Sequence, residues 1–205
     1  MRVLLAIVLA AGAPAVHHTA EGTKAARSSL LSARDLGKSW TAAAPTSQRG
    51  VELSCAGHEP SARGIVERGA ASSPSFSASQ AGPFVQQTTS VYASTAQVNA
   101  WWRRAVTPSL VACAAGTIDA LRARGVKVTA ATQAKLRIST ALPHTASYRV
   151  VATANGKKLY FDLIVLGSGD TISAITISSF VQPVPARVET ALARLVVAKL
   201  GGPAA

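Results

Sequence analysis

The sequence predicts an α+β fold, in which an antiparallel β-sheet of about five to seven strands carries helices and one disulfide staples the domain. Three observations predict it. Strand patterns and tight turns follow one another through the second half, helical patterns stand before and after that run, and the chain holds two cysteines. This order of elements is typical of a sheet with helices packed on it. The 205 residues are enough for one domain with a substantial core.

The N-terminus has the pattern of a secretory signal peptide over residues 1–15. Arg2 precedes an apolar run that ends in small residues, and cleavage is expected after Ala15. Roughly 13 apolar residues span about 20 Å as a helix, less than the ~30 Å of bilayer hydrocarbon, which disfavours a membrane anchor. A buried N-terminal helix or an uncleaved interfacial anchor is the alternative. Residues 16–27 are expected to form a flexible leader, 28–200 the domain and 201–205 a disordered tail.

The two cysteines, Cys55 and Cys113, are expected to form one disulfide, because thiols of exported proteins are oxidised. The bridge would close a loop of about 59 residues, which the chain-entropy account equates with roughly 4 kcal/mol of stability. Two buried free thiols are the alternative. No cysteine directly follows the apolar N-terminal run, so a lipoprotein is not expected. The protein is therefore expected to be secreted or associated with the cell envelope.

The formal net charge of +12 falls to +11 without Arg2. In an exported protein, the anions that such a surface meets are lipid headgroups and acidic wall polymers, so nucleic acid is not an expected partner. The basic residues are scattered in short groups, such as Arg103 with Arg104, and none forms a long run. Two interpretations stay open: a generally cationic, solvated surface, or a specific anion-binding patch.

The first third of the domain shows short elements. Leucines before Gly37 predict a helix over 28–36, and Trp40 follows it. Residues 41–50 are rich in Ala, Pro, Ser and Gln and are expected to form a surface loop. Weak strand patterns follow at Val51–Leu53, Ile65–Ala70 and Phe76–Ala78.

A strand over 84–93 and a long helix come next. Ser94 and Gln97 form a capping box, and the buried stripe that follows contains both Trp101 and Trp102. This spacing favours core packing of the tryptophans over a membrane or base-stacking role. Pro108 interrupts the helix, and a second stripe then includes Leu110, Cys113, Ala114, Thr117, Ile118 and Leu121.

The remainder predicts a strand meander and a last helix. The strand patterns cover 126–132, 134–140, 147–154, 157–167 and 171–180, and Asn155-Gly156 indicates a type I′ hairpin turn. The strand at 157–167 is apolar enough to be central, apart from Asp162, which we expect to pair with a cross-strand cation such as Arg149. Beyond Pro183 and Pro185, a helix with apolar Val188, Leu192, Leu195 and Val196 is expected to pack on the sheet.

These elements resemble the extracellular sensor domain of actinobacterial serine/threonine kinases of the PknH type, over about residues 28–200. The resemblance is carried by the segment Leu30 to Gly37 with Trp40, by Cys55, Phe76, Val91-Tyr92, Ala96, Trp101, Pro108 to Leu110, Cys113 and Asp162-Leu163. It implies an antiparallel sheet flanked by helices with a cleft, and a ligand-sensing or wall-associated role. This chain has one cysteine pair where the kinase sensor is expected to have two, and no kinase domain, so a signalling output is not implied.

No catalytic, cofactor-binding or metal-binding residue is expected from the sequence. Its nine acidic residues form no pair typical of glycoside hydrolysis, and His58 and His144 lack the spacing of metal ligands. The leading hypothesis is a non-enzymatic, monomeric sensor-like or ligand-binding domain. Its ligand would be a small molecule, a lipid or a wall component, and an anionic envelope surface is a further candidate. The candidate cleft or structural residues are Trp40, Trp101, Tyr148 and Asp162.

Two alternatives differ in class. An envelope protein that binds other proteins would use a flat basic face without a pocket. A secreted hydrolase would need a Ser or Asp hydrogen-bonded to His58 or His144 within a pocket.

Overall fold

The structure is a computed structural model that describes residues 15–45, 49–53, 55, 57–111, 125, 127–180 and 182–201. Its strands are β1 (Ala15–Val16), β2 (Thr41–Ala43), β3 (Val66–Ser72), β4 (Ser75–Ser77), β5 (Phe84–Tyr92), β6 (Val128–Lys135), β7 (His144–Ala154), β8 (Lys157–Ser168) and β9 (Thr171–Phe180). Its helices in the described residues are α1 (Ala20–Ser28), α2 (Ala33–Leu36), α3 (Thr95–Ala105), the 3-10 turn η1 (Pro108–Leu110) and α5 (Ala186–Lys199).

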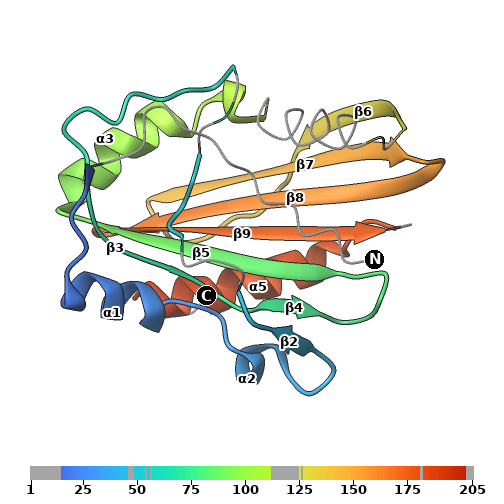
Figure 1. Ribbon diagram of the computed structural model, residues 1–205, viewed down its shortest axis with the longest axis horizontal. Helices are drawn as coiled ribbons and strands as arrows, with labels where there is room; N and C mark the ends of the chain where they lie inside the picture. Colours follow the sequence, from blue (N-terminus) through green and yellow to red (C-terminus); the bar gives the residue numbers. More distant parts are fainter. Residues whose placement is uncertain are drawn as a thin grey trace.

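The strands form one sheet of nine, with the order β1-β3-β5-β9-β8-β7-β6 and with β4 joining β2 to β5 (Figure 1). All pairs are antiparallel except β1 with β3. The expected α+β class with helices on a mainly antiparallel sheet is confirmed. Strands β1 and β2 were not expected, because two or three residues are too few for a periodic pattern, whereas β4 overlaps the weak strand predicted at Phe76–Ala78.

The hairpin turn between β7 and β8 and the central position of β8 were predicted correctly. Asn155 and Gly156 both have positive φ, 50° and 76°, as the predicted hairpin turn requires. The following strand, β8, lies between β7 and β9 and is central as expected. The two strands predicted over 126–132 and 134–140 are instead one strand, β6, whose register shifts between Val128 and Ala130.

The two faces of the sheet carry different helices. On one face, called the α5 face, β4, β5, β8 and β9 pack against α5; its buried residues include Phe76, Val85, Ile164, Leu166, Ile175, Ile177, Leu192 and Val196. On the other, called the α3 face, the core includes Tyr92, Val98, Trp101, Val165, Ile172 and Ala174. Because neighbouring strand residues point to opposite faces, Ile164 and Val165 belong to different halves of the core.

Helix α3 begins as predicted, with the Ser94 hydroxyl accepting a hydrogen bond from the Gln97 N–H. The Gln97 side chain accepts from the Val66 N–H at 2.8 Å rather than completing the capping box. Trp101 is buried as expected. Trp102 is half-buried, and its ring stacks on that of His144 at a centroid distance of 4.7 Å.

The flexible leader predicted over 16–27 is wrong. Helix α1 occupies most of it and buries Gly22 and Ala26 against β3 and β5, and the His18 Nε2 lies 2.8 Å from the Glu67 carboxylate. The segment lacks large apolar residues because it approaches the sheet through small ones. A Cβ atom on Gly22 would lie well under 3.0 Å from the Arg68 backbone, and one on Gly69 would meet the backbone of α1.

Three other predictions need correction. Only Ala33–Leu36 of the helix expected over 28–36 is helical as α2, while Leu31 lies in the α5-face core. Val51 and Leu53 are buried, but their segment forms no strand, and the Val51 N–H donates to the Ser90 hydroxyl. Residues 41–43, predicted as loop, form β2.

Several predictions lie outside the described residues: nearly all of the signal peptide, Cys113 with most of the second helical stripe, and the tail beyond 201. In the part of the chain that is described, no helix combines the length and the hydropathy needed to cross a membrane.

Candidate functional site

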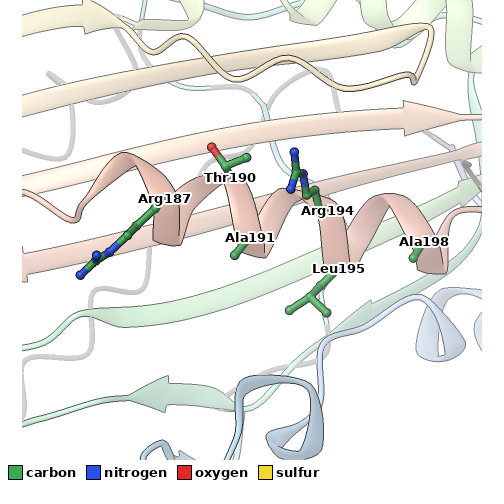
Figure 2. A pocket seen from close by; sticks show the side chains of 6 residues that line it. All are labelled: Arg187, Thr190, Ala191, Arg194, Leu195 and Ala198. Carbon is green, nitrogen blue, oxygen red and sulfur yellow. The ribbon is translucent and has the colours of Figure 1, made fainter. Parts of the chain in front are cut away.

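A hollow of about 560 Å³ lies along the outer surface of α5 (Figure 2). Among the described residues it is lined by Arg187, Thr190, Ala191, Arg194, Leu195 and Ala198. Its volume falls within the ~300–1,000 Å³ that is typical of small-molecule sites. The lining residues are exposed or half-buried, so the hollow is open to solvent.

The amphipathic pattern of α5 produces this surface. Pro185 is the N-cap, and Leu192, Ala193, Val196 and Val197 face the sheet. The lining residues recur at the three- and four-residue spacing of the opposite face. Arg187 and Arg194 are seven residues apart, which is two helical turns or about 10 Å of helix.

The two arginines carry the charge of the hollow. Neither forms an ion pair with any described residue, whereas Lys199 at the end of the helix pairs with Asp35 at 3.1 Å. The helix's acidic residue, Glu189, is 2 % exposed and faces the sheet. The described lining therefore combines two unpaired cations with an apolar strip of Ala191, Leu195 and Ala198.

The residues predicted as a candidate cleft do not come together. Trp101 and Tyr148 belong to the α3-face core, while Trp40 packs against the α5-face core and Asp162 lies on that same face. Trp101 is buried, and Trp40 and Tyr148 are partly buried packing residues. None of the four lines the hollow on α5.

The predicted partner of Asp162 is confirmed. Arg149 lies opposite Asp162 in the β7–β8 register and donates two hydrogen bonds to its carboxylate, Nε to Oδ1 at 2.7 Å and NH2 to Oδ2 at 2.8 Å. This bidentate hydrogen bond, together with the carboxylate charge, raises the pKa of Arg149. The sequence did not reveal the third member, Glu189, which accepts from the same guanidinium.

The hydrolase alternative finds one of its two requirements. His58 is buried, its Nε2–H donates to the Ala105 carbonyl at 2.8 Å, and its Nδ1 lies 2.8 Å from the Ser109 hydroxyl. The hollow on α5 includes neither residue. The N–H groups of Leu110 and Val111 bond to backbone carbonyls of this turn, so they are not available to an oxyanion.

His144 has a different environment. Its Nε2 lies 2.7 Å from the Asn99 side-chain oxygen, and its ring stacks on Trp102. Its pKa is lowered because burial, and then the charge of Arg103, disfavour the imidazolium. Within the described residues, no three His, Cys, Asp or Glu side chains are grouped as metal ligands.

Comparison with known proteins adds no family. No model of a protein family matches this chain, and no curated protein is significantly similar to it. The resemblance to the PknH-type sensor domain therefore stays a prediction.

A sequence signal for the hollow did exist. Arg187, Ala191, Arg194 and Ala198 have the spacing of one helical face. A search for apolar stripes does not find this face, because two of its residues are charged. Leu195, predicted to pack on the sheet, is half-buried against the α5-face core and also lines the hollow.

Proposed function

We propose that this protein is an exported, non-enzymatic binding domain of the cell envelope that holds an anionic amphiphile along α5. The observation that carries the proposal is the hollow of about 560 Å³, whose apolar strip is accompanied by two arginines that form no ion pair with a described residue. Guanidinium groups bind sulfate, phosphate and carboxylate oxygens, and the apolar strip accommodates hydrocarbon. The ligand class predicted from the sequence, a lipid or another envelope component, agrees with this chemistry.

The chemistry of the hollow, an apolar strip beside two arginines, matches a single amphiphile with an anionic headgroup. Arg187 and Arg194 are separated by about 10 Å along the helix, and their side chains are long enough for both guanidinium groups to reach one anionic headgroup. A free inorganic anion would leave the apolar strip of Ala191, Leu195 and Ala198 uncovered. The resemblance to the PknH-type sensor supports the same role, since that family implies ligand sensing outside the cell.

Export and the disulfide are part of this proposal. Cys55 is buried, and it is not a free thiol. Cys55 and His58 exchange two backbone hydrogen bonds, and the His58 ring bonds to Ala105 and Ser109. Ser109 precedes Cys113 by four residues, so these bonds hold Cys55 close to the segment that leads to its predicted partner.

Replacing either cysteine by serine, Cys55→Ser or Cys113→Ser, is expected to lower Tm by about 10 °C, because roughly 4 kcal/mol of chain-entropy stabilisation is lost. Thermal unfolding with and without reductant checks this. Wild type should respond to reductant as strongly as to either substitution, and the two variants should not respond. Unequal variants and an unresponsive wild type would indicate two free thiols.

The ligand proposal is tested by calorimetric titration with decyl sulfate, whose headgroup stays ionised at all working pH values. Wild type is expected to bind it, and Arg187→Gln and Arg194→Gln should each weaken binding about tenfold, the loss of one charge-assisted hydrogen bond. Inorganic sulfate and decanol, which each lack one half of the amphiphile, should bind much more weakly.

The charge-matched control for the double variant Arg187→Gln, Arg194→Gln is Arg63→Gln with Arg68→Gln, two exposed arginines that do not line the hollow. This pair removes the same charge and should leave the affinity for decyl sulfate unchanged. If the Arg63/Arg68 double variant weakened binding as much as the Arg187/Arg194 double variant, net charge alone would attract the probe. Binding only to anionic vesicles would favour a membrane surface instead.

A further inference from the structure

Three charged side chains meet beneath the first turn of α5. Arg149 from β7 donates to Asp162 of β8, to Glu189 of α5 and to the Val184 carbonyl, the last at 3.2 Å. The side chains of Asp162 and Glu189 are 1 % and 2 % exposed. One guanidinium therefore ties two strands, the loop before α5 and the helix itself.

The charges of this cluster do not balance. With both carboxylates ionised, two negative charges would share the one positive charge of Arg149. Tyr160 on β8 also faces Arg149, but its phenol adds no positive charge. In the described residues the salt bridges supply no second cation to either carboxylate. A surplus negative charge in a buried site is costly, and one proton on the carboxylate pair removes it.

The cluster adjoins the hollow. Glu189 stands between Arg187 and Thr190 in the sequence, and both of these line the hollow (Figure 2). Arg187 lies in the first turn of α5, so any movement of that turn away from β7 and β8 must displace the part of the hollow that Arg187 lines.

We propose that Glu189, which shares the Arg149 guanidinium with Asp162, takes up a proton, and that this proton holds the first turn of α5 on the sheet and keeps the hollow in its binding form. The part about binding rests on the proposed function, while the proton uptake does not.

The direction of the pH effect follows from the carboxylate environment. Burial, and then the neighbouring Asp162, raise the pKa of Glu189 from 4.5 to about 7. A pKa raised by folding means that the folded state binds the proton more tightly. The resulting stabilisation is complete below the unfolded pKa and is lost as the pH rises through the folded pKa. The stability of the protein and its affinity for its ligand are therefore both expected to fall as the solution becomes alkaline.

Thermal unfolding of wild type, Glu189→Gln and Asp162→Asn between about pH 5 and about pH 9 tests the proton uptake. Wild-type Tm is expected to fall by about 5 °C or more relative to Glu189→Gln across this range. Glutamine mimics the protonated side chain and removes the step. Asp162→Asn also removes it, because the remaining carboxylate pairs with Arg149 and stays ionised. A step that persists in Glu189→Gln, or a flat wild type, overturns the proposal.

Decyl sulfate titrations on the same samples separate the two ideas. Wild-type affinity is expected to weaken about tenfold from low to high pH, whereas Glu189→Gln keeps its low-pH affinity. A step in Tm without any binding would refute the proposed function but leave the proton uptake intact. Binding that ignores pH, together with a step in Tm, would overturn the link between cluster and hollow.

Discussion

Arg149→Met is expected to destabilise the protein by about 3–5 kcal/mol, because it leaves two buried carboxylates without a cation. This corresponds to a fall in Tm of about 10 °C or more. Calorimetric or circular-dichroism melting measures it directly. The loss should be greatest at alkaline pH, where the raised pKa of Glu189 is exceeded and its carboxyl group loses its proton.

Two controls accompany Arg149→Met. Arg137→Met changes an exposed arginine and should stay within about 0.5 kcal/mol of wild type. The triple variant Arg149→Met, Asp162→Leu, Glu189→Leu replaces the whole cluster by apolar groups and should recover most of the loss. If the triple variant is no better than Arg149→Met, the damage comes from packing of the arginine stem rather than from unpaired charge.

Gly22→Ala is expected to destabilise the protein by about 2 kcal/mol, although alanine is better than glycine within a helix by about 1 kcal/mol. The added methyl would meet the backbone of Arg68 and Gly69, which cannot turn aside as a side chain can. Gly69→Ala should cost as much, because the contact is the same one seen from β3. Urea unfolding at equilibrium gives both values.

The matched control is Lys24→Ala, an exposed position on the same helix, which should stay within about 0.5 kcal/mol of wild type. A gain in stability from Gly22→Ala would mean that α1 behaves as a solvated helix. In that case the flexible leader predicted from the sequence would be the better description of these residues.

The sequence predicted the elements in which one local signal is sufficient. The hairpin at Asn155-Gly156 depends on two residues that tolerate positive φ, and the start of α3 depends on the Ser94 cap. The Arg149–Asp162 pair was predictable because a lone carboxylate in an apolar strand requires a cation on the neighbouring strand. These inferences needed the contacts of no more than two adjacent elements.

Helix α1 could not be predicted in this way. Its buried positions are Gly22 and Ala26, so it has no apolar stripe, and its fit depends on Gly69, more than 40 residues away in the sequence. The short strands β1 and β2 likewise depend on pairing with β3 and β4, strands that are distant in the sequence.

The four candidate cleft or structural residues do not share one site, for a reason of geometry. Trp101 and Tyr148 were grouped with Trp40 and Asp162 by residue type, but strand alternation and helix position place the two pairs on opposite faces of the sheet. Glu189 was missed because an acidic residue in the first turn of a helix looks the same in the sequence whether its side chain is exposed to solvent or buried against the sheet. Its role follows from the position of Arg149, which only the folded structure supplies.

Native mass spectrometry of the protein secreted by its own organism tests the central claim, that α5 carries an anionic amphiphile, most directly. The expected mass is that of the chain beginning at Val16 with an acidic amphiphile bound, and Arg187→Gln with Arg194→Gln should lose the bound molecule. A secreted protein that carries no such molecule, or the same adduct in wild type and in the double variant, would contradict it.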